Sequence, residues 1–275
     1  MTIRIAVSSL AAAVILASVA QAALAGADLV SHRAIYKMSL ATAKSGSGVT
    51  AASGAMSYKF GDSCNGWTVE NKTALTFAYS DGAPVTTTWD FVTWESKDGL
   101  HYRFRVRSTR DGTVNEEIEG VADLDGKGKG GVAKFTLPEA KTLKLPKGTL
   151  FPTEHTVRMI ELAQTGEHLA ERTLFDGTGT DQAFQVSAII GKASPIAKIS
   201  GPLEVTGINR KLLNTASWPM QMAFFPDGSA DPEPDYEVGV RYYQNGVADE
   251  VLQSFGNFSL KGTLEKLESL PKSDC

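Results

Sequence analysis

The chain has 275 residues, of which 42% are hydrophobic and 21% charged, and its formal net charge at pH 7 is -4. An apolar fraction of this size is enough to build a buried core, which excludes an intrinsically disordered chain. The mildly acidic balance argues against nucleic acid or an anionic membrane surface as a general partner.

Residues 1–25 are predicted to be a cleaved export signal. Arg4 provides a short positive region, Ile5–Val19 form an apolar run, and A-x-A cleavage sites follow at Ala20–Ala22 and Ala23–Ala25. The run is diluted by alanine and serine and is too short for a membrane anchor, which needs about 20 apolar residues. Residues 26–275 are therefore expected to form a single domain in the periplasm, with no stable membrane anchor.

Both cysteines, Cys64 and Cys275, belong to this exported part. An even count in an oxidising compartment favours a disulfide over free thiols. An intramolecular bridge would tie the last residue of the chain back to a polar turn near the first strands. Two reduced thiols, or an intermolecular bridge through the terminal cysteine, are the alternatives that the residues alone leave open.

Short runs in which apolar and polar residues alternate dominate the rest of the chain and predict strands with one buried face. Their succession predicts an all-β protein built as a long antiparallel meander. The runs are His32–Leu40, Ala55–Phe60, Trp67–Tyr79, Thr86–Trp94, His101–Arg107, Val132–Leu137, Leu169–Phe175, Ala183–Ile190, Leu203–Ile208, Met220–Phe225, Tyr236–Tyr243 and Glu250–Leu264.

The first hairpin whose register can be predicted has Arg110–Gly112 at its tip. This segment suits a three-residue loop with its glycine in the left-handed conformation. The loop places Arg105 opposite Glu117 and Arg103 opposite Glu119. The arginines of this strand are therefore interpreted as the solvated face of a paired strand and not as an anion site.

One amphipathic helix is predicted between these strands, from Glu154 to Thr165. Thr153 is its expected cap, and Gly166 is expected to end it in the left-handed conformation. A single helix in a strand-rich chain has to bury its apolar stripe against the sheet, so we expect it to plug or line a concave sheet surface. The stripe consists of Val157, Met159, Ile160, Leu162 and Ala163.

A second hairpin is predicted at Asn245–Gly246, the preferred pair for a two-residue turn. This turn places Val240 opposite Val251 and Arg241 opposite Glu250. Both are favourable cross-strand pairs, one apolar and one of opposite charge.

No motif predicts a reaction. Gly126–Gly131 matches the pattern G-x-G-x-x-G, but a strand follows it where a phosphate cradle needs a helix, so a hairpin tip is predicted. The histidines (His32, His101, His155 and His168) lack the spacing of zinc ligands.

The sequence therefore predicts no catalytic, cofactor-binding or metal-binding residues. His155, which shares a helical face with Met159, is interpreted as a packing residue with satisfied hydrogen bonds and is the first candidate if the chain is an enzyme. The four tryptophans are interpreted as core residues and not as a ligand site, and they are Trp67, Trp89, Trp94 and Trp218.

A series of short segments links most of the exported chain to a known family. The segments are His32–Tyr36, Met56–Phe60 followed by Cys64, Leu145–Gly148, Phe151–His155, Leu174–Gly177, Pro234–Glu237, Asn245–Val247, Phe258–Gly262 and Cys275. In this order, and with these two cysteine positions, the sequence resembles the EipB-like family of periplasmic cell-envelope integrity proteins.

The resemblance implies a sheet wound into an open, spiral-like β-barrel that holds the helix, closed by a disulfide between Cys64 and Cys275. It also implies a role in maintaining the envelope under stress, without a cofactor. The first hypothesis is a non-enzymatic scaffold or interaction module with an envelope protein or lipid as partner. The alternative is a carrier or sensor that binds a lipid or another apolar envelope molecule in the concave β surface. An enzyme is the third hypothesis.

Overall fold

A computed structural model describes residues 27–196, 204–205, 207–271 and 273–275. The predicted export signal at residues 1–25 lies outside this part, as do residues 203 and 206 of the predicted run Leu203–Ile208. All seventeen strands of the described part belong to one sheet. The strands are β1 (His32–Ala43), β2 (Val49–Asp62), β3 (Gly66–Tyr79), β4 (Val85–Ser96), β5 (His101–Arg110), β6 (Thr113–Leu124), β7 (Gly131–Leu137), β8 (Lys141–Leu145), β9 (Thr149–Leu150), β10 (Leu169–Leu174), β11 (Phe184–Ile190), β12 (Glu204–Val205), β13 (Ile208–Asn209), β14 (Ser217–Pro226), β15 (Tyr236–Tyr243), β16 (Ala248–Ser254) and β17 (Phe258–Ser269).

The strands follow one another around a nearly closed barrel. β1 to β8 form an antiparallel meander, β17 pairs with the other edge of β1, and β16, β15, β14, β11 and β10 continue from it. β9 pairs with β10 in parallel and is linked to β8 by residues 146–148, so the two ends of the ladder approach each other. The predicted all-β barrel is confirmed, with β9–β10 and the short contact of β13 with β17 as parallel exceptions.

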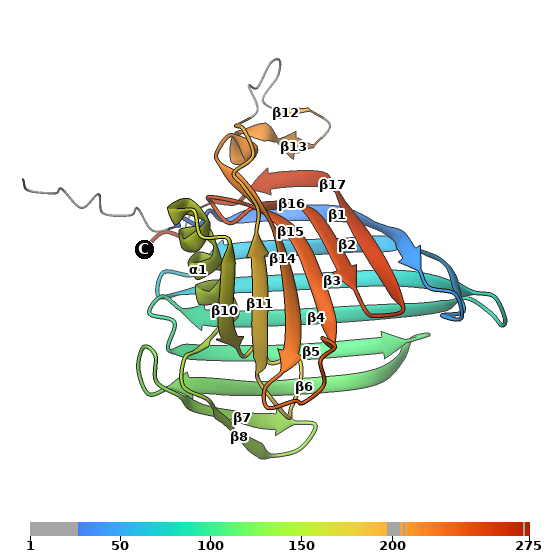
Figure 1. Cartoon of the computed structure of the whole chain (residues 1–275), viewed down its shortest axis with the longest axis horizontal. Coiled ribbons are helices and arrows are strands. Elements are labelled where there is room, and N and C mark those ends of the chain that lie inside the picture. The colour runs from blue at the N-terminus through green and yellow to red at the C-terminus, as the bar shows by residue number, and fades with distance from the viewer. Residues whose placement is uncertain (1–26, 197–203, 206, 272) are drawn as a thin grey trace, which may run out of the picture.

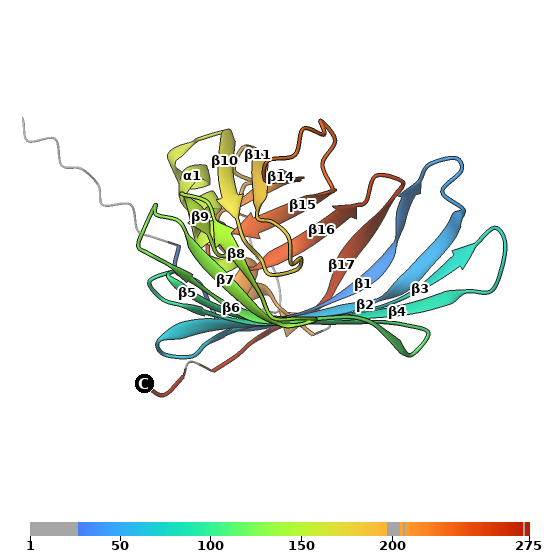
Figure 2. The ribbon, with the colours of Figure 1, turned by 90° about the horizontal axis from the view of Figure 1, so that it is seen from below.

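Two groups of strands cross each other and enclose the interior. β10, β11, β14 and β15 run across β3 to β6 (Figure 1), and β1 to β7 form a curved floor below them (Figure 2). Because side chains alternate along a strand, each strand directs every second residue to the inside. On β1, for example, Ala34, Tyr36 and Met38 are buried, as the sequence pattern predicts.

Helix α1 (Pro152–Thr165) lies at one end of the barrel, between β9 and β10 in sequence (Figure 2). Its buried residues Met159, Ile160 and Ala163 pack with the inner faces of β11 and β14. Gly166 ends the helix with φ 83°, as predicted. The predicted cap is wrong, because Thr153 lies inside the first turn and the N-cap residue Phe151 forms no side-chain cap bond.

The loop between β5 and β6 has two residues, Asp111 and Gly112, with φ of 51° and 80°. The predicted three-residue loop and its register are therefore wrong by two positions. Arg105 pairs with Glu119, where 3.7 Å separate Nε from the carboxylate. Because the displacement is even, the charged residues remain on the outer face, so the predicted solvated arginine face agrees with the structure.

The loop between β15 and β16 is longer than predicted, whereas the loop between β5 and β6 is shorter. The Tyr243 N–H donates to the Val247 carbonyl (2.8 Å), so three residues and not two form the loop. A bulge in β16 then restores the predicted pair of Val240 with Val251. Arg241 faces both residues of the bulge and lies 2.7 Å from the Asp249 carboxylate and 3.0 Å from that of Glu250.

The predicted run Glu250–Leu264 is in fact two strands. β16 ends at Ser254 and β17 begins at Phe258, and Gly256 turns the chain with φ 72°. Within the described ranges, no helix is long and apolar enough to cross a membrane.

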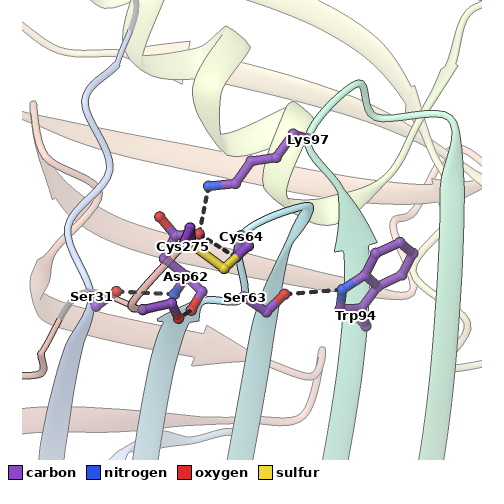
Figure 3. Close-up of a disulfide and its surroundings, with 8 residues drawn as sticks. Ser31, Asp62, Ser63, Cys64, Trp94, Lys97 and Cys275 are labelled. Carbon is purple, nitrogen blue, oxygen red and sulfur yellow. Dashed lines mark hydrogen bonds and ion pairs between the residues drawn. A yellow bond between two sulfur atoms is a disulfide. The ribbon is translucent and has the colours of Figure 1, made fainter.

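The last residues of the chain are fixed to the turn between β2 and β3 (Figure 3). Cys275 is joined by a disulfide to Cys64, which the sequence separates from it by 211 positions. Beside the bridge, the Asp62 carboxylate accepts the Cys64 N–H (3.0 Å) and forms an ion pair with Lys97 (2.9 Å). The Ser273 hydroxyl donates to the Asp62 carbonyl, so the terminal segment is held by more than the sulfur atoms.

Replacing Cys64 or Cys275 by Ser should lower the free energy of unfolding by about 2–5 kcal/mol, because the bridge restricts a very long loop in the unfolded chain. Denaturant melts would measure the loss. The double variant should lose no more than either single variant, and wild type in reductant should match all three. An unchanged midpoint in reductant would show that the bridge does not contribute to stability.

A candidate ligand cavity inside the barrel

A cavity of ≈ 610 Å³ lies between the inner faces of β2 to β4 and those of β14 to β17. This volume lies within the range of about 300–1,000 Å³ that is typical of small-molecule sites. Most of its lining is apolar, and no lysine or arginine of the described part of the chain contributes to it. The space is therefore suited chemically to an apolar molecule.

Strand β3 forms one wall of the cavity. Its lining residues run at every second position from Val69 to Phe77, which corresponds to about 26 Å along the strand. The cavity is therefore elongated along the strands. The interpretation of Trp89 as a core residue holds only in part. Trp89 on β4 is half-buried and packs against a core cluster, but it also lines the cavity beside Phe91, with 5.2 Å between the ring centroids.

The other tryptophans lie outside the cavity lining. Trp218 is buried at 6% exposure and belongs to the core around α1, as predicted. Trp67 and Trp94 are half-buried, and each has a cation against its ring, Lys97 and Arg103 respectively. Core packing therefore describes Trp218 but not these two residues.

The opposite wall is aromatic and aliphatic. Phe224 on β14 stacks on Tyr236 on β15, with 4.3 Å between the ring centroids, and Met222 and Val238 continue this wall. Phe255, at the tip of the hairpin between β16 and β17, also lines the cavity and is 42% exposed. The lining thus reaches the protein surface at this tip, which places a mouth of the cavity there.

The first turn of α1 lies at the other end of the cavity, where Glu95 of β4 holds it. Oε2 of Glu95 accepts the Thr153 N–H (2.6 Å), and Oε1 accepts the Glu154 N–H (2.8 Å). The Glu95 carboxylate therefore caps the N-terminus of α1 in place of an N-cap side chain. Glu95 is only 2% exposed. Burial raises its pKa to about 7, and the hydrogen bonds from α1 oppose this rise.

Sequence reasoning did not find Glu95. Its partners on α1 are 58 and 59 positions away, and no local motif connects them. One signal was available, because Trp89, Phe91, Thr93 and Glu95 share the inward phase of β4. A glutamate on the buried face of a strand needs partners, and helix N–H groups are suitable ones.

A second polar group lies deep in the cavity. Tyr58 on β2 is directly opposite Asn71 on β3, and Tyr242 reaches the same region from β15. Burial, followed by the proximity of Tyr242, raises the pKa of Tyr58. Asn71 accepts a hydrogen bond from Thr73 (3.1 Å). The tyrosine hydroxyls therefore remain un-ionised at neutral pH.

His155 lies in α1 and contributes to the lining. It is 5% exposed, and its Nε2 has no hydrogen-bond partner in the described part of the chain. Burial, followed by the charge of Arg172, lowers its pKa to about 4, so the ring is neutral at pH 7. The burial agrees with the packing interpretation, but the unpartnered Nε2 does not agree with the expectation of satisfied hydrogen bonds.

The other motif residues do not converge on the cavity. His101 pairs with Asp123 on an exposed surface, and His168 contacts the Ile190 carbonyl. His32 is buried against the Val30 carbonyl. Gly126–Gly131 forms the predicted hairpin tip between β6 and β7. Over the described ranges, no group of three or more His, Cys, Asp or Glu side chains could hold a metal ion.

The fold and the cavity define a nearly closed β-barrel with a hollow, mainly apolar interior and a helix at one end. Residues 23–271 match the model of the EipB-like family, and the chain belongs to that family. It is 32% identical over 253 residues to the cell envelope integrity protein EipB of Brucella abortus (strain 2308), covering 90% of this chain and 87% of the relative. A crystal structure of a β-barrel-like protein of a domain of unknown function, also from Brucella abortus, superposes with a TM-score of 0.78 at 31% identity. The match covers 89% of this chain and all of that one.

Exchanging Glu95 for Gln should change how stability depends on pH. A carboxyl whose pKa is raised by folding binds its proton more tightly in the folded state. Its contribution is therefore complete below pH 4.5 and is lost as the pH rises through 7. Relative to Glu95→Gln, the wild type should lose about 3 kcal/mol of unfolding free energy between these pH values.

Denaturant melts at several pH values would measure this difference. Glu139→Gln, at an exposed position, is the matched control and should follow the wild type. Parallel pH curves for the wild type and Glu95→Gln would contradict the buried, ionisable cap.

Proposed function

We propose that this chain is a non-enzymatic periplasmic protein that binds an apolar molecule of the cell envelope inside its barrel and thereby supports envelope integrity. The observation that carries the proposal is the cavity of ≈ 610 Å³, whose lining contains no lysine or arginine. The name of the Brucella abortus relative supports the envelope role, and the predicted export signal supports the compartment.

The sequence-based hypotheses placed a scaffold first and a carrier or sensor second. The cavity favours the carrier or sensor over the scaffold. Protein interiors are normally close-packed, and an empty apolar volume costs stability because its lining loses contacts. A scaffold needs no such volume, whereas a carrier or sensor does. The hollow interior therefore favours binding of a small apolar molecule.

A scaffold role remains the second candidate because of one feature of the outer surface. Leu169 and Ile189 are directly paired on β10 and β11 and are 73% and 62% exposed. Ile189 also borders an outer groove of ≈ 530 Å³ together with Leu252. Exposed apolar side chains that gather in this way are typical of contact surfaces.

The enzyme hypothesis has less support. It requires a base oriented by a carboxylate, with His155 as the first candidate. The described residues provide no carboxylate hydrogen-bonded to His155, and its lowered pKa makes it a weak base. We therefore propose that the chain catalyses no reaction.

Filling the cavity should weaken binding without unfolding the protein. Thr73→Trp places an indole inside the cavity opposite Trp89, whereas Thr76→Trp places it on the outer face of the same strand. Thr73→Trp should weaken binding of a fluorescent acyl probe at least about tenfold, since the ligand loses its apolar burial. Thr76→Trp should bind like the wild type.

The same pair separates the two functions in cells. In a strain that lacks the protein, Thr76→Trp should restore detergent resistance and Thr73→Trp should not. Full rescue by a folded Thr73→Trp protein would favour the scaffold. Absence of probe binding to wild type would refute the carrier.

A further inference from the structure

The charges around the cavity restrict what can be bound in it. Among the described residues, Asp176 is the only acidic residue of the lining, and no lysine or arginine is part of it. The Asp176 carboxylate is already engaged, because it accepts the Thr178 N–H and hydroxyl (2.9 and 2.8 Å) and lies 3.4 Å from the Tyr236 hydroxyl. Burial raises the pKa of Asp176.

An anionic headgroup would therefore find no cation inside the cavity and would face Asp176, with Glu95 behind the helix end. A cationic headgroup would find a single carboxylate, whose Oδ1 already accepts two hydrogen bonds from Thr178 and whose Oδ2 lies 3.4 Å from the Tyr236 hydroxyl. Moving an ion from water into such a space is costly unless it is paired and hydrogen-bonded. The lining thus disfavours charged groups of either sign.

The deep end of the cavity offers neutral hydrogen-bonding groups. Within the described residues the Tyr58 hydroxyl forms no hydrogen bond, and the half-buried Tyr58 side chain lines the cavity. Asn71 is directly opposite it, and Tyr242 approaches from the facing wall. A hydroxyl can both donate and accept, so this group suits a ligand hydroxyl or amide.

From Asn71 to Phe77 the wall of β3 extends about 20 Å toward the mouth. Beyond Leu75 it becomes aromatic, with Phe77 packed edge-on against Phe258 at a centroid distance of 5.6 Å. This stretch is suited to one long apolar chain. The polar deep end and the apolar outer stretch together resemble the two parts of a simple amphiphile.

We propose that the cavity binds an uncharged amphiphile, whose hydroxyl or amide group is bound at Tyr58, Asn71 and Tyr242 and whose apolar chain runs toward Phe255. This inference rests on the proposed function and specifies its ligand class. It excludes phospholipids and free fatty acids with their charged groups inside the barrel.

Competition binding on the delipidated exported chain tests the proposal. N-phenyl-1-naphthylamine serves as an uncharged fluorescent probe, and hexadecanol, hexadecyl phosphate and hexadecyltrimethylammonium compete with it below their aggregation concentrations. Hexadecanol should displace the probe at a concentration at least about tenfold lower than either charged compound, because burying an unpaired charge is costly. Equal or tighter binding of a charged compound would overturn the proposal.

Tyr58→Phe tests the deep end directly, because it removes only the hydroxyl. It should weaken hexadecanol about fivefold, the size expected for one hydrogen bond. Binding of the probe itself should not change. Tyr79→Phe, on β3 and outside the cavity lining, is the matched control and should bind like the wild type. Unchanged hexadecanol affinity in Tyr58→Phe would refute the assigned position of the head group.

The failures of the two proposals are distinguishable. If the probe does not bind to the wild type, no apolar site exists and the proposed function fails. If the probe binds and Thr73→Trp blocks it, but the three head groups do not differ, only the ligand class is wrong.

Discussion

The arrangement of this barrel depends on the hydrogen bonds that the buried carboxylate of Glu95 accepts from the first turn of α1. This carboxylate joins β4, in the first half of the chain, to the first turn of α1, after which the chain returns as β10 to β17. Helix N–H groups at a buried end have to be paired, and the N-cap residue Phe151 provides no side chain for this. The carboxylate pairs two of them and fixes the helix at the end of the cavity. The cost is a charge held at 2% exposure, which the raised pKa of Glu95 reflects.

The barrel and its inward residues could be predicted from the sequence because alternation reports the buried face whatever the register. The hairpin at Asp111 and Gly112 differs by two positions from its prediction and still keeps the same faces. Loop lengths could not be predicted in the same way. In the hairpin of β15 and β16, the bulge at Asp249 and Glu250 compensates for an extra loop residue that no local sequence rule reveals. The cap by Glu95 was missed because its partners are remote in sequence. A binding surface on the concave side of the sheet was expected only as the alternative hypothesis, and its lining residues could not be named, because alternation gives the same pattern whether an inward Trp89 meets a neighbour or a void.

Two physical properties of the interior bear on function. Its walls come from two crossing groups of strands whose inner faces separate, and the space between them is lined by side chains that carry no positive charge. Burial keeps two polar side chains of the lining neutral at pH 7, since it raises the pKa of Tyr58 and lowers that of His155. Asp176 is the acidic residue of the lining among the described residues. Such an interior can exclude ions and retain an apolar molecule. The disulfide of Cys64 with Cys275 lies at the surface turn between β2 and β3, so closure of the chain and shape of the cavity are separate features.

Native mass spectrometry of the protein isolated from its own cell envelope, in mild detergent and without reductant, tests the central claim most directly. We expect an oxidised chain that carries one small adduct, released by organic solvent and identified as an uncharged amphiphile. A chain that is free of adducts in every preparation would contradict a ligand-binding barrel and direct attention to its outer surface. A phospholipid adduct would retain the carrier role but contradict the assigned chemistry of the deep end.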